Sequence, residues 1–205
     1  MRLILGTPKT SSWSLRAYLS TGELINSTTI DWRSFDEHSK LTDATDCPTR
    51  QVPVLYTDEA PDVAIIETFA ILEALAERGG LPWPVDALLR ARARSLCLEF
   101  QHHSDELRKL VPMNFADTQQ IMQAPASLYA WLLRLEAVLD EARGVYLFGE
   151  LSAADAWFAP LIARGIRCRA IHSETLKRYT AALKHTTGWR QWAALVDDCD
   201  PAYTS

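Results

Sequence analysis

The sequence predicts a mixed fold, in which a small α/β domain precedes an all-helical domain. Up to about residue 80, short apolar segments of strand length alternate with segments that have the periodicity of amphipathic helices. Residues 79–86 (GGLPWPVD) then combine two glycines with two prolines, which interrupt helices and strands alike. Beyond them the apolar residues recur at steps of three and four. We therefore expect an N-terminal domain over residues 1–78, a linker over 79–86 and a helical domain over 87–205.

The elements of the first domain follow from these patterns. Its strands are predicted at residues 2–6 (RLILG), 28–33 (TTIDWR), 52–57 (VPVLYT) and 63–66 (VAII). One helix is predicted to begin in the serine-rich turn TSSWSLRAYL and to continue to about residue 24, and a second covers residues 67–79. Such an alternation of strands and helices is typical of a small α/β domain.

In the second domain an apolar stripe predicts one long helix. Its residues recur at alternating steps of four and three: Leu89, Ala93, Leu96, Phe100, His103, Leu107 and Leu110. Further helices are predicted at residues 128–142 and 151–163. The second of these opens with Ser152 and Asp155 at the spacing of a capping box, in which each side chain bonds the other residue's backbone N–H. We expect these helices to form a bundle.

The composition argues against several function classes. The chain has 205 residues, of which 48% are hydrophobic and 23% charged, as in soluble globular proteins. A net charge of −5 without a stripe of Lys and Arg argues against a nucleic-acid partner, because phosphates need a basic surface. No apolar stretch approaches the roughly 18 residues that span a bilayer, and residues 1–5 lack the features of a secretory signal. We therefore expect a cytoplasmic protein without a membrane partner.

The cysteines give no sign of a metal centre. Cys47, Cys97, Cys168 and Cys199 form no C-x-x-C pair and have no histidine at the spacing of a zinc ligand. Thiols are kept reduced in the cytoplasm. We expect neither a metal site nor redox chemistry at these residues.

Four segments occur in the order and with the spacing found in one enzyme family. They are SSWSLR (11–16), RQVPVL (50–55), ETFAILEAL (67–75) and SAADAWFAPL (152–161). On these segments the chain resembles the cytosolic glutathione S-transferases over nearly its whole length, and its serine-rich turn is similar to that of the zeta class. The resemblance implies a thioredoxin-like first domain, a helical-bundle second domain, glutathione as co-substrate and a homodimer.

The resemblance also implies which residues hold glutathione. Val52 and Pro53 fall where the family has a cis-proline, which lets the backbone of Val52 pair with the peptide like an added strand. The alternative is an ordinary trans proline that begins a strand. Gln51, Lys40 and Arg50 are candidates for the glycyl carboxylate, although solvated surface charge is the alternative for both basic residues.

Glu67 and Thr68 match the pair of residues with which the family reads the γ-glutamyl group. A helix N-terminus supplies free N–H groups and a positive dipole for the carboxylate of that group. The Thr68 hydroxyl adds a donor, and the Glu67 carboxylate accepts from the ammonium. The alternative is that Thr68 only caps the helix.

The serine-rich turn corresponds to the catalytic position of the family. A thiol with a pKa of about 8.5 becomes a thiolate near neutral pH when a hydroxyl donates to it at a helix N-terminus. Ser11 matches the catalytic position best, and Ser12 is the rival because the helix start is uncertain by one residue. The alternative is that Ser11, Ser12 and Ser14 only cap the helix. We expect no mixed-disulfide chemistry, because neither residue 11 nor residue 12 is a cysteine.

The second substrate is expected between the domains. By their position in the family's fold, the candidate residues for this electrophile site are Trp13, Phe100, His103, Met113, Asn114 and Trp157. A partly buried structural histidine is the alternative for His103, since no partner is visible in the sequence. The tryptophans Trp189 and Trp192 are interpreted as packing residues.

These patterns together predict a glutathione transferase that activates the thiol for attack on small hydrophobic electrophiles, as in detoxification. One alternative is a glutathione-dependent cis-trans isomerase of the maleylacetoacetate-isomerase type. Arg16 fits the zeta pattern, but Ala17 and Tyr18 replace residues expected in the basic run of those isomerases. The other alternative is a non-catalytic glutathione-binding protein on the same fold.

Overall fold

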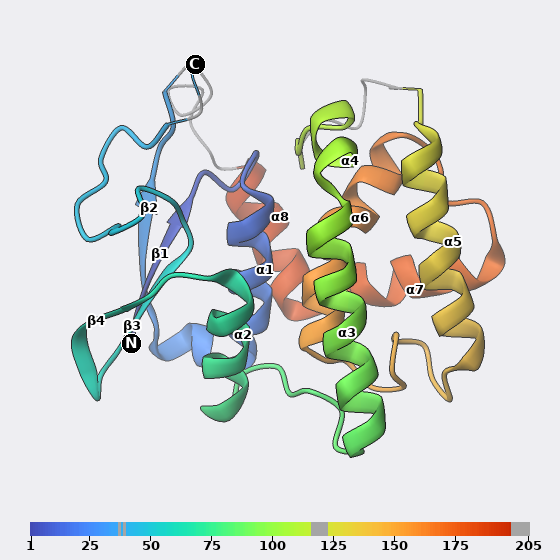
Figure 1. Ribbon diagram of the computed structural model, residues 1–205, viewed down its shortest axis with the longest axis horizontal. Coiled ribbons are helices and arrows are strands. Elements are labelled where there is room, and N and C mark those ends of the chain that lie inside the picture. Colours follow the sequence, from blue (N-terminus) through green and yellow to red (C-terminus); the bar gives the residue numbers. More distant parts are fainter. Residues whose placement is uncertain (37, 39, 116–122, 198–205) are drawn as a thin grey trace.

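The computed structural model describes residues 1–36, 38, 40–115 and 123–197. Within them a four-stranded sheet lies at one end, and helices of the second half of the chain lie at the other (Figure 1). The strands are β1 (Arg2–Gly6), β2 (Thr29–Arg33), β3 (Val54–Thr57) and β4 (Ala60–Ile65). The helices are α1 (Ser12–Ser20), the 3₁₀ helix η1 (Gly22–Ser27), α2 (Thr68–Glu77), α3 (Ala87–His103), α4 (Asp105–Leu110), α5 (Ala126–Glu141), α6 (Ala153–Arg167), α7 (Glu174–His185) and α8 (Thr187–Asp197).

The sheet has the strand order β2-β1-β3-β4, with β1 parallel to β2 and antiparallel to β3. Successive side chains of β1 point to opposite faces. Leu3 and Leu5 therefore join the core formed with α1 and α2, whereas Ile4 faces a second, smaller core. The loop before β3 supplies Leu41 and Cys47 to that smaller core. Both faces of the sheet are thus covered.

The strands predicted from the sequence are all present, but the first helix ends earlier than predicted. Helix α1 stops at Ser20 and not near residue 24. Gly22 then adopts φ +53°, a left-handed conformation that glycine tolerates because it has no Cβ. The chain continues as the 3₁₀ helix η1, whose backbone hydrogen bonds differ from those of an α-helix.

The prediction of one long helix over the stripe from Leu89 to Leu110 is wrong. Ser104, with φ −102° and ψ 5°, leaves the helical conformation, ends α3 and begins α4. Asp105 and Glu106 then occupy the first turn of α4, where the helix dipole favours acidic side chains. The break stops the apolar stripe before its last residue. Leu107 is buried, but Leu110 is 47% exposed.

Helix α6 lies at the centre of the second half of the chain and contacts α1, α3, α5 and α7. Its predicted capping box is confirmed at Ser152 and Asp155. The Asp155 carboxylate accepts from the backbone N–H of Ser152 at 2.8 Å and from that of Leu147 at 3.1 Å. A single buried carboxylate therefore fixes both the start of α6 and the loop before it.

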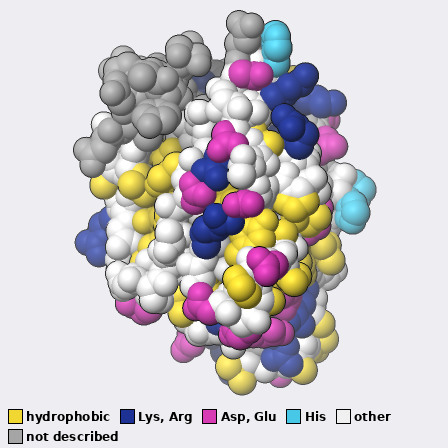
Figure 2. Space-filling model, turned by 90° about the vertical axis from the view of Figure 1, so that its left-hand side faces the viewer, with side chains coloured by type: hydrophobic (Ala, Val, Ile, Leu, Met, Phe, Trp, Pro, Cys, Tyr) yellow, Lys and Arg dark blue, Asp and Glu magenta, His cyan; other side chains and the backbone are white. Residues whose placement is uncertain are grey.

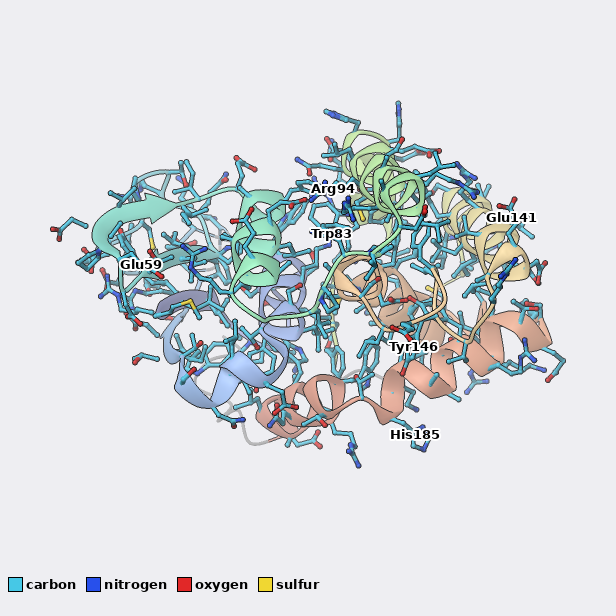
Figure 3. All side chains as sticks on the ribbon, turned by 90° about the horizontal axis from the view of Figure 1, so that it is seen from below. Glu59, Trp83, Arg94, Glu141, Tyr146 and His185 are labelled. Carbon is cyan, nitrogen blue, oxygen red and sulfur yellow. The ribbon has the colours of Figure 1, made fainter. Side chains whose placement is uncertain are left out.

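The segment between α2 and α3 is anchored on both sides. The N–H of Leu81 donates to the carbonyl of Ser20 at 2.9 Å, and the N–H of Ala153 donates to the carbonyl of Pro82 at 2.9 Å. Arg94 lies beside Trp83, with its guanidinium carbon 5.5 Å from the ring centroid (Figure 3). These contacts hold the connecting segment against α1 and α6. The division into domains at residues 79–86 stays a prediction.

Charges of both signs are mixed on the surface that Figure 2 shows. Acidic and basic side chains lie interspersed among apolar ones on this face. Binding to nucleic-acid phosphates instead requires a continuous basic surface. In the described residues, no helix has both the length and the apolar character needed to cross a membrane.

Candidate functional site

The serine-rich turn connects the end of β1 to α1 through a chain of hydrogen bonds. Ser11 is the N-cap of α1, and its Oγ accepts from the Ser14 N–H at 3.3 Å. The two hydroxyl oxygens, Ser11 Oγ and Ser14 Oγ, are 2.8 Å apart. Ser14 Oγ in turn accepts from the N–H of Gly6 at 2.8 Å. The capping role is therefore confirmed for Ser11.

The other two serines of the turn do not cap α1. Ser12 is the first helical residue, and Ser14 is completely buried against the strand. Ser11 and Ser12 are each 7% exposed, so exposure does not distinguish the two catalytic candidates. Which of them meets a thiol stays a prediction.

The bond between Val52 and Pro53 is cis, so the sequence prediction is confirmed. The alternative of a trans proline that begins a strand is wrong, and β3 begins at Val54, directly after the proline. Val52 is largely buried, whereas Gln51 before it is exposed. This loop therefore presents a polar residue next to the irregular backbone ahead of the strand.

Helix α2 begins with an N-terminus that no side chain of the described residues caps. Glu67 is the N-cap residue and makes no side-chain hydrogen bond to the first turn. Thr68 is the first helical residue and is buried, so the alternative that Thr68 caps the helix is wrong. The first backbone N–H groups of a helix have no partner within it, and together with the helix dipole they attract anions. Because Thr68 belongs to this first turn, its hydroxyl adds a further hydrogen-bond donor to the backbone N–H groups at this end of α2.

These segments meet at a cavity of about 220 Å³. Its lining residues are Trp13, Gln51, Val52, Ile66, Glu67, Thr68, Gln101 and Arg108. The cavity brings together the loop before β3, the start of α2 and Trp13 of α1, all of which the sequence analysis placed in or beside the substrate sites. The catalytic candidates Ser11 and Ser12 directly precede Trp13 but do not belong to this lining. Lys40 and Arg50 are exposed and do not belong to this lining.

Three lining residues, Ile66, Gln101 and Arg108, were missed in the sequence analysis. Ile66 directly precedes the start of α2, Gln101 comes from the end of α3, and Arg108 comes from α4. The position of Arg108 depends on the break at Ser104, for which the apolar periodicity gives no signal. With a continuous helix, Arg108 would have been placed on a different face.

The candidates for the electrophile site occupy different environments. Trp13 is partly buried, and its ring lies 5.8 Å from that of Trp157. Phe100 and Trp157 are enclosed in the core, at 1% and 0% exposure, so they support the site from beneath and have no surface to offer a ligand. His103 is exposed, and the alternative of a partly buried structural histidine is wrong for it.

Met113 and Asn114 follow α4 and are the remaining candidates. Met113 is buried, and the Oδ1 atom of Asn114 is enclosed without a hydrogen-bond partner in the described residues. Arg164 and Arg167 bind the backbone directly before Met113. Arg164 Nε donates to the carbonyl of Val111 at 2.8 Å, and Arg167 Nη1 donates to that of Pro112 at 2.9 Å.

Arg16 is buried beside Trp13, at 1% exposure. Its Nε donates to the carbonyl of Trp157 at 2.8 Å, and its Nη1 has no hydrogen-bond partner among the described residues. The guanidinium carbon lies 4.2 Å from the ring centroid of Trp13 and 4.6 Å from that of Trp157. Such cation–π contacts offset part of the cost of burying the charge.

The electrostatics around Arg16 are strongly positive. Burial and repulsion from Arg164 and Arg108 lower the pKa of Arg16. Burial likewise lowers the pKa of Arg164 to about 10, still far above neutral pH. Arg108 lies with its guanidinium carbon 4.9 Å from the Trp13 ring centroid and pairs with Asp105. Trp13 therefore contacts two cationic side chains, of which Arg108 also lines the cavity.

The described residues contain no cluster of three or more His, Cys, Asp or Glu side chains that could hold a metal ion. Cys47, Cys97 and Cys168 are free and buried, while Cys199 lies outside the described residues. Burial raises the pKa of all three thiols, most strongly that of Cys97.

The arrangement was compared with known proteins. No family model and no curated protein sequence matches the chain. Among solved structures, a glutathione transferase homologue from Burkholderia with bound glutathione has a TM-score of 0.66 at 22% identity, covering 97% of this chain and 98% of its own. A maleylpyruvate isomerase, described as a bacterial zeta-class glutathione S-transferase, has a TM-score of 0.65 at 22% identity, covering 96% and 98%.

A maleylacetoacetate isomerase from Anaeromyxobacter dehalogenans is also similar, with a TM-score of 0.63 at 24% identity, covering 93% of this chain and 89% of its own. At such low identities the likeness establishes the fold and leaves the activity open. The coverage shows that both the sheet-containing half and the helical half of the chain take part in the match. The chain therefore has the fold of the glutathione transferases, a thioredoxin-like part followed by a helical part.

Proposed function

We propose that this protein is a glutathione transferase that activates the glutathione thiol for attack on small hydrophobic electrophiles. The observation that carries the proposal is the cavity shared by the cis-proline loop, the start of α2 and Trp13, which directly follows Ser11 and Ser12 in the first turn of α1. Each of these three features supplies the chemistry that one part of the tripeptide requires. The similarity in fold to a glutathione transferase homologue with bound glutathione supports the same reading.

In this proposal the tripeptide is held along the cavity. The N–H groups of the first turn of α2 and the Thr68 hydroxyl donate to the γ-glutamyl carboxylate, while Glu67 accepts from the ammonium. The backbone of Val52 pairs with the cysteinyl unit in the manner of an added strand. Gln51, which lines the cavity, is the first proposed donor to the glycyl carboxylate, and Lys40, which is exposed outside the lining, is the second.

The chemistry proposed for the serine turn is stabilisation of a thiolate. On binding, the thiol loses its proton to solvent, and the hydroxyl of Ser11, or of Ser12, donates a hydrogen bond to the sulfur. The N-terminus of α1 adds a positive dipole, and the buried charge of Arg16 adds to the positive potential. The thiolate then attacks the electrophile in the region of Trp13, Met113 and Asn114.

A second candidate function is the isomerisation of a carboxylate-bearing substrate, and the arginines favour it. Arg108 lines the cavity, while Arg16 and Arg164 are buried close behind it. In such a reaction the thiolate adds to a conjugated double bond, the carbon–carbon bond rotates, and elimination regenerates glutathione. Two proteins with similar structures are described as isomerases of maleylpyruvate and of maleylacetoacetate. Ala17 and Tyr18 depart from the sequence pattern of the isomerases. For this reason we propose glutathione transfer as the first function and isomerisation as the second.

The proposal includes a cytoplasmic homodimer that acts in detoxification. A shallow groove between α2 and α3 is lined by Phe69, Ala70 and Leu98, and Leu98 is 39% exposed. Nearby, Val63 and Ile66 also expose apolar surface. A second copy of the chain would bury this surface, and light scattering of the purified protein tests it.

One set of assays separates the candidate functions. Ultraviolet absorbance of the thiolate, recorded as glutathione is added at neutral pH, tests activation. A chlorodinitrobenzene then tests conjugation, which consumes glutathione, whereas maleylacetone tests isomerisation, which does not. Glutathione binding without thiolate absorbance would instead identify a non-catalytic binding protein. Failure to bind glutathione would overturn all three.

A further inference from the structure

The hydrogen bonds of the serine turn continue beyond the two catalytic candidates to Ser14. Ser14 is completely buried and lies one helical turn after Ser11. Its hydroxyl contacts the end of β1 on one side, through the N–H of Gly6 at 2.8 Å, and the Ser11 hydroxyl on the other, also at 2.8 Å. Gly6 is held by its pairing with Arg33 in the sheet, and a side chain does not fit there because a Cβ would lie 2.7 Å from the ring of Phe35.

The two hydroxyl protons have two possible arrangements. A serine hydroxyl donates once and accepts through two lone pairs. In the first arrangement, the one in the structure, Ser11 donates to Ser14. In the second, which requires an external anion to accept the Ser11 proton, Ser14 donates to Ser11 while its own oxygen still accepts from Gly6. Ser11 Oγ then accepts both from the N–H and from the O–H of Ser14, so both lone pairs are used and its proton is free for an external acceptor.

We infer that Ser14 is a positioning residue that turns the Ser11 hydroxyl outward and polarises it when a thiolate binds. The inference rests on the proposed function and on Ser11 as the activating residue. The relay runs from the Gly6 N–H through Ser14 Oγ and Ser11 Oγ to the sulfur. Every internal link is buried, and hydrogen bonds in such surroundings strengthen one another because the local dielectric is low.

An anchoring role alone does not account for both contacts of the Ser14 hydroxyl. An anchor between β1 and α1 needs only the bond from Gly6 to Ser14. The second contact, to Ser11 at 2.8 Å, places the same oxygen against the residue at the catalytic position. Ser20 provides the contrast, because it is a completely buried serine of the same helix whose Oγ has no hydrogen-bond partner in the described residues.

The test is the pKa of glutathione bound to the full-length protein, measured as thiolate absorbance against pH. The variants are Ser11→Ala, Ser14→Ala and the double variant, with Ser20→Ala as the matched control. Removing the charge-assisted bond from Ser11 should raise the bound thiol pKa by about one to two units. Removing Ser14 should raise it by about half a unit, which lowers kcat/KM roughly threefold at a pH below that pKa.

The double variant gives the sharpest result. If Ser14 acts through Ser11, the double variant and Ser11→Ala should have the same bound thiol pKa, whereas independent effects would add. Ser20→Ala should leave the pKa unchanged, although it also alters a buried serine. Should Ser14→Ala not fold, Ser14→Cys has nearly the same shape with a weak donor and should give the same rise, and Ser14→Thr should restore the wild-type value.

The outcomes are distinct. A wild-type thiolate with an unchanged pKa in folded Ser14→Ala or Ser14→Cys would overturn the relay alone. An added shift in the double variant would overturn it as well, and so would an effect of Ser12→Ala without one of Ser11→Ala. The absence of a thiolate in the wild-type protein would instead overturn the proposed function, and the relay with it.

Discussion

Asp155 is a completely buried carboxyl, and its replacement by Asn should change how stability depends on pH. Loss of solvation raises its pKa from 3.8 to about 6, even though hydrogen bonds from Leu147 and Ser152 pull in the opposite direction. Because the pKa is higher in the folded state, the folded protein holds the proton more tightly between these two values. Stability should therefore fall as the pH rises from below 4 to above 6.

The magnitude follows from the shift. About two pKa units correspond to about 3 kcal/mol, a large share of the roughly 5–15 kcal/mol that stabilises a typical domain. Asp155→Asn keeps the shape and one oxygen acceptor but cannot ionise. It also replaces the acceptor of the Ser152 N–H by a donor, which costs about 1–3 kcal/mol at every pH. Relative to wild type, the variant should gain about 3 kcal/mol between the acid and neutral ends of the range.

The assay is urea unfolding, followed by circular dichroism at a series of pH values, for wild type and variant. The difference between the two unfolding free energies removes the titration of all other groups. Ser173→Ala is the control, because Ser173 caps α7 through the Leu176 N–H and does not titrate. Its cost should be about 1 kcal/mol at every pH. A pH-independent difference for Asp155→Asn would refute the argument that this buried carboxyl changes its charge in that range.

Four further substitutions test the candidate site and the capping box of α6. Ser11→Ala should raise the pKa of bound glutathione and lower turnover with little change in glutathione affinity, and the same effect from Ser12→Ala alone would move the catalytic role by one residue. Thr68→Val should raise the KM for glutathione roughly ten- to a hundredfold, because it deletes a donor to a charged group, while the thiol titrates as before; unchanged affinity would exclude Thr68 from the site. Arg108→Leu should reduce kcat/KM about tenfold or more for carboxylate-bearing substrates and leave neutral electrophiles nearly unaffected; equal losses for both would remove the argument for an anionic substrate. Ser152→Ala should cost about 0.5–2 kcal/mol in unfolding free energy and leave activity intact well below the melting temperature; lost turnover at full stability would contradict a purely structural role.

Local chemistry explains how much of the fold was predictable. The apolar run of Leu3, Ile4 and Leu5 predicted a strand, and the structure shows why all three are apolar, because they lie in two separate cores on opposite faces of the sheet. The capping box at Ser152 was also predictable, because both of its residues lie within one helical turn and are therefore close in the sequence. The break at Ser104 was not, because serine is tolerated inside helices and the apolar period continues across it.

The site also contains residues that could be predicted from the sequence and residues that could not. Val52, Glu67 and Thr68 belong to short motifs, and the structure brings these motifs together at one cavity. Arg108 reaches that cavity only because α4 changes direction after α3. The burial of Arg16 was equally hidden, since arginine is mostly found at protein surfaces and is rarely buried without an acidic partner.

Arg16 and Arg108 carry the same charge beside Trp13, yet physical access gives them different roles. Arg16 lies against the rings of Trp13 and Trp157 and is only 1% exposed, so we expect it to act at a distance through its field. Such a field is weakly screened because Arg16, Ser11 and Ser12 are all buried. Arg108 is partly exposed and can exchange its bond to Asp105 for one to a ligand. A buried cation therefore favours a thiolate whatever the second substrate is, whereas selectivity for an anionic substrate depends on the arginine that lines the cavity.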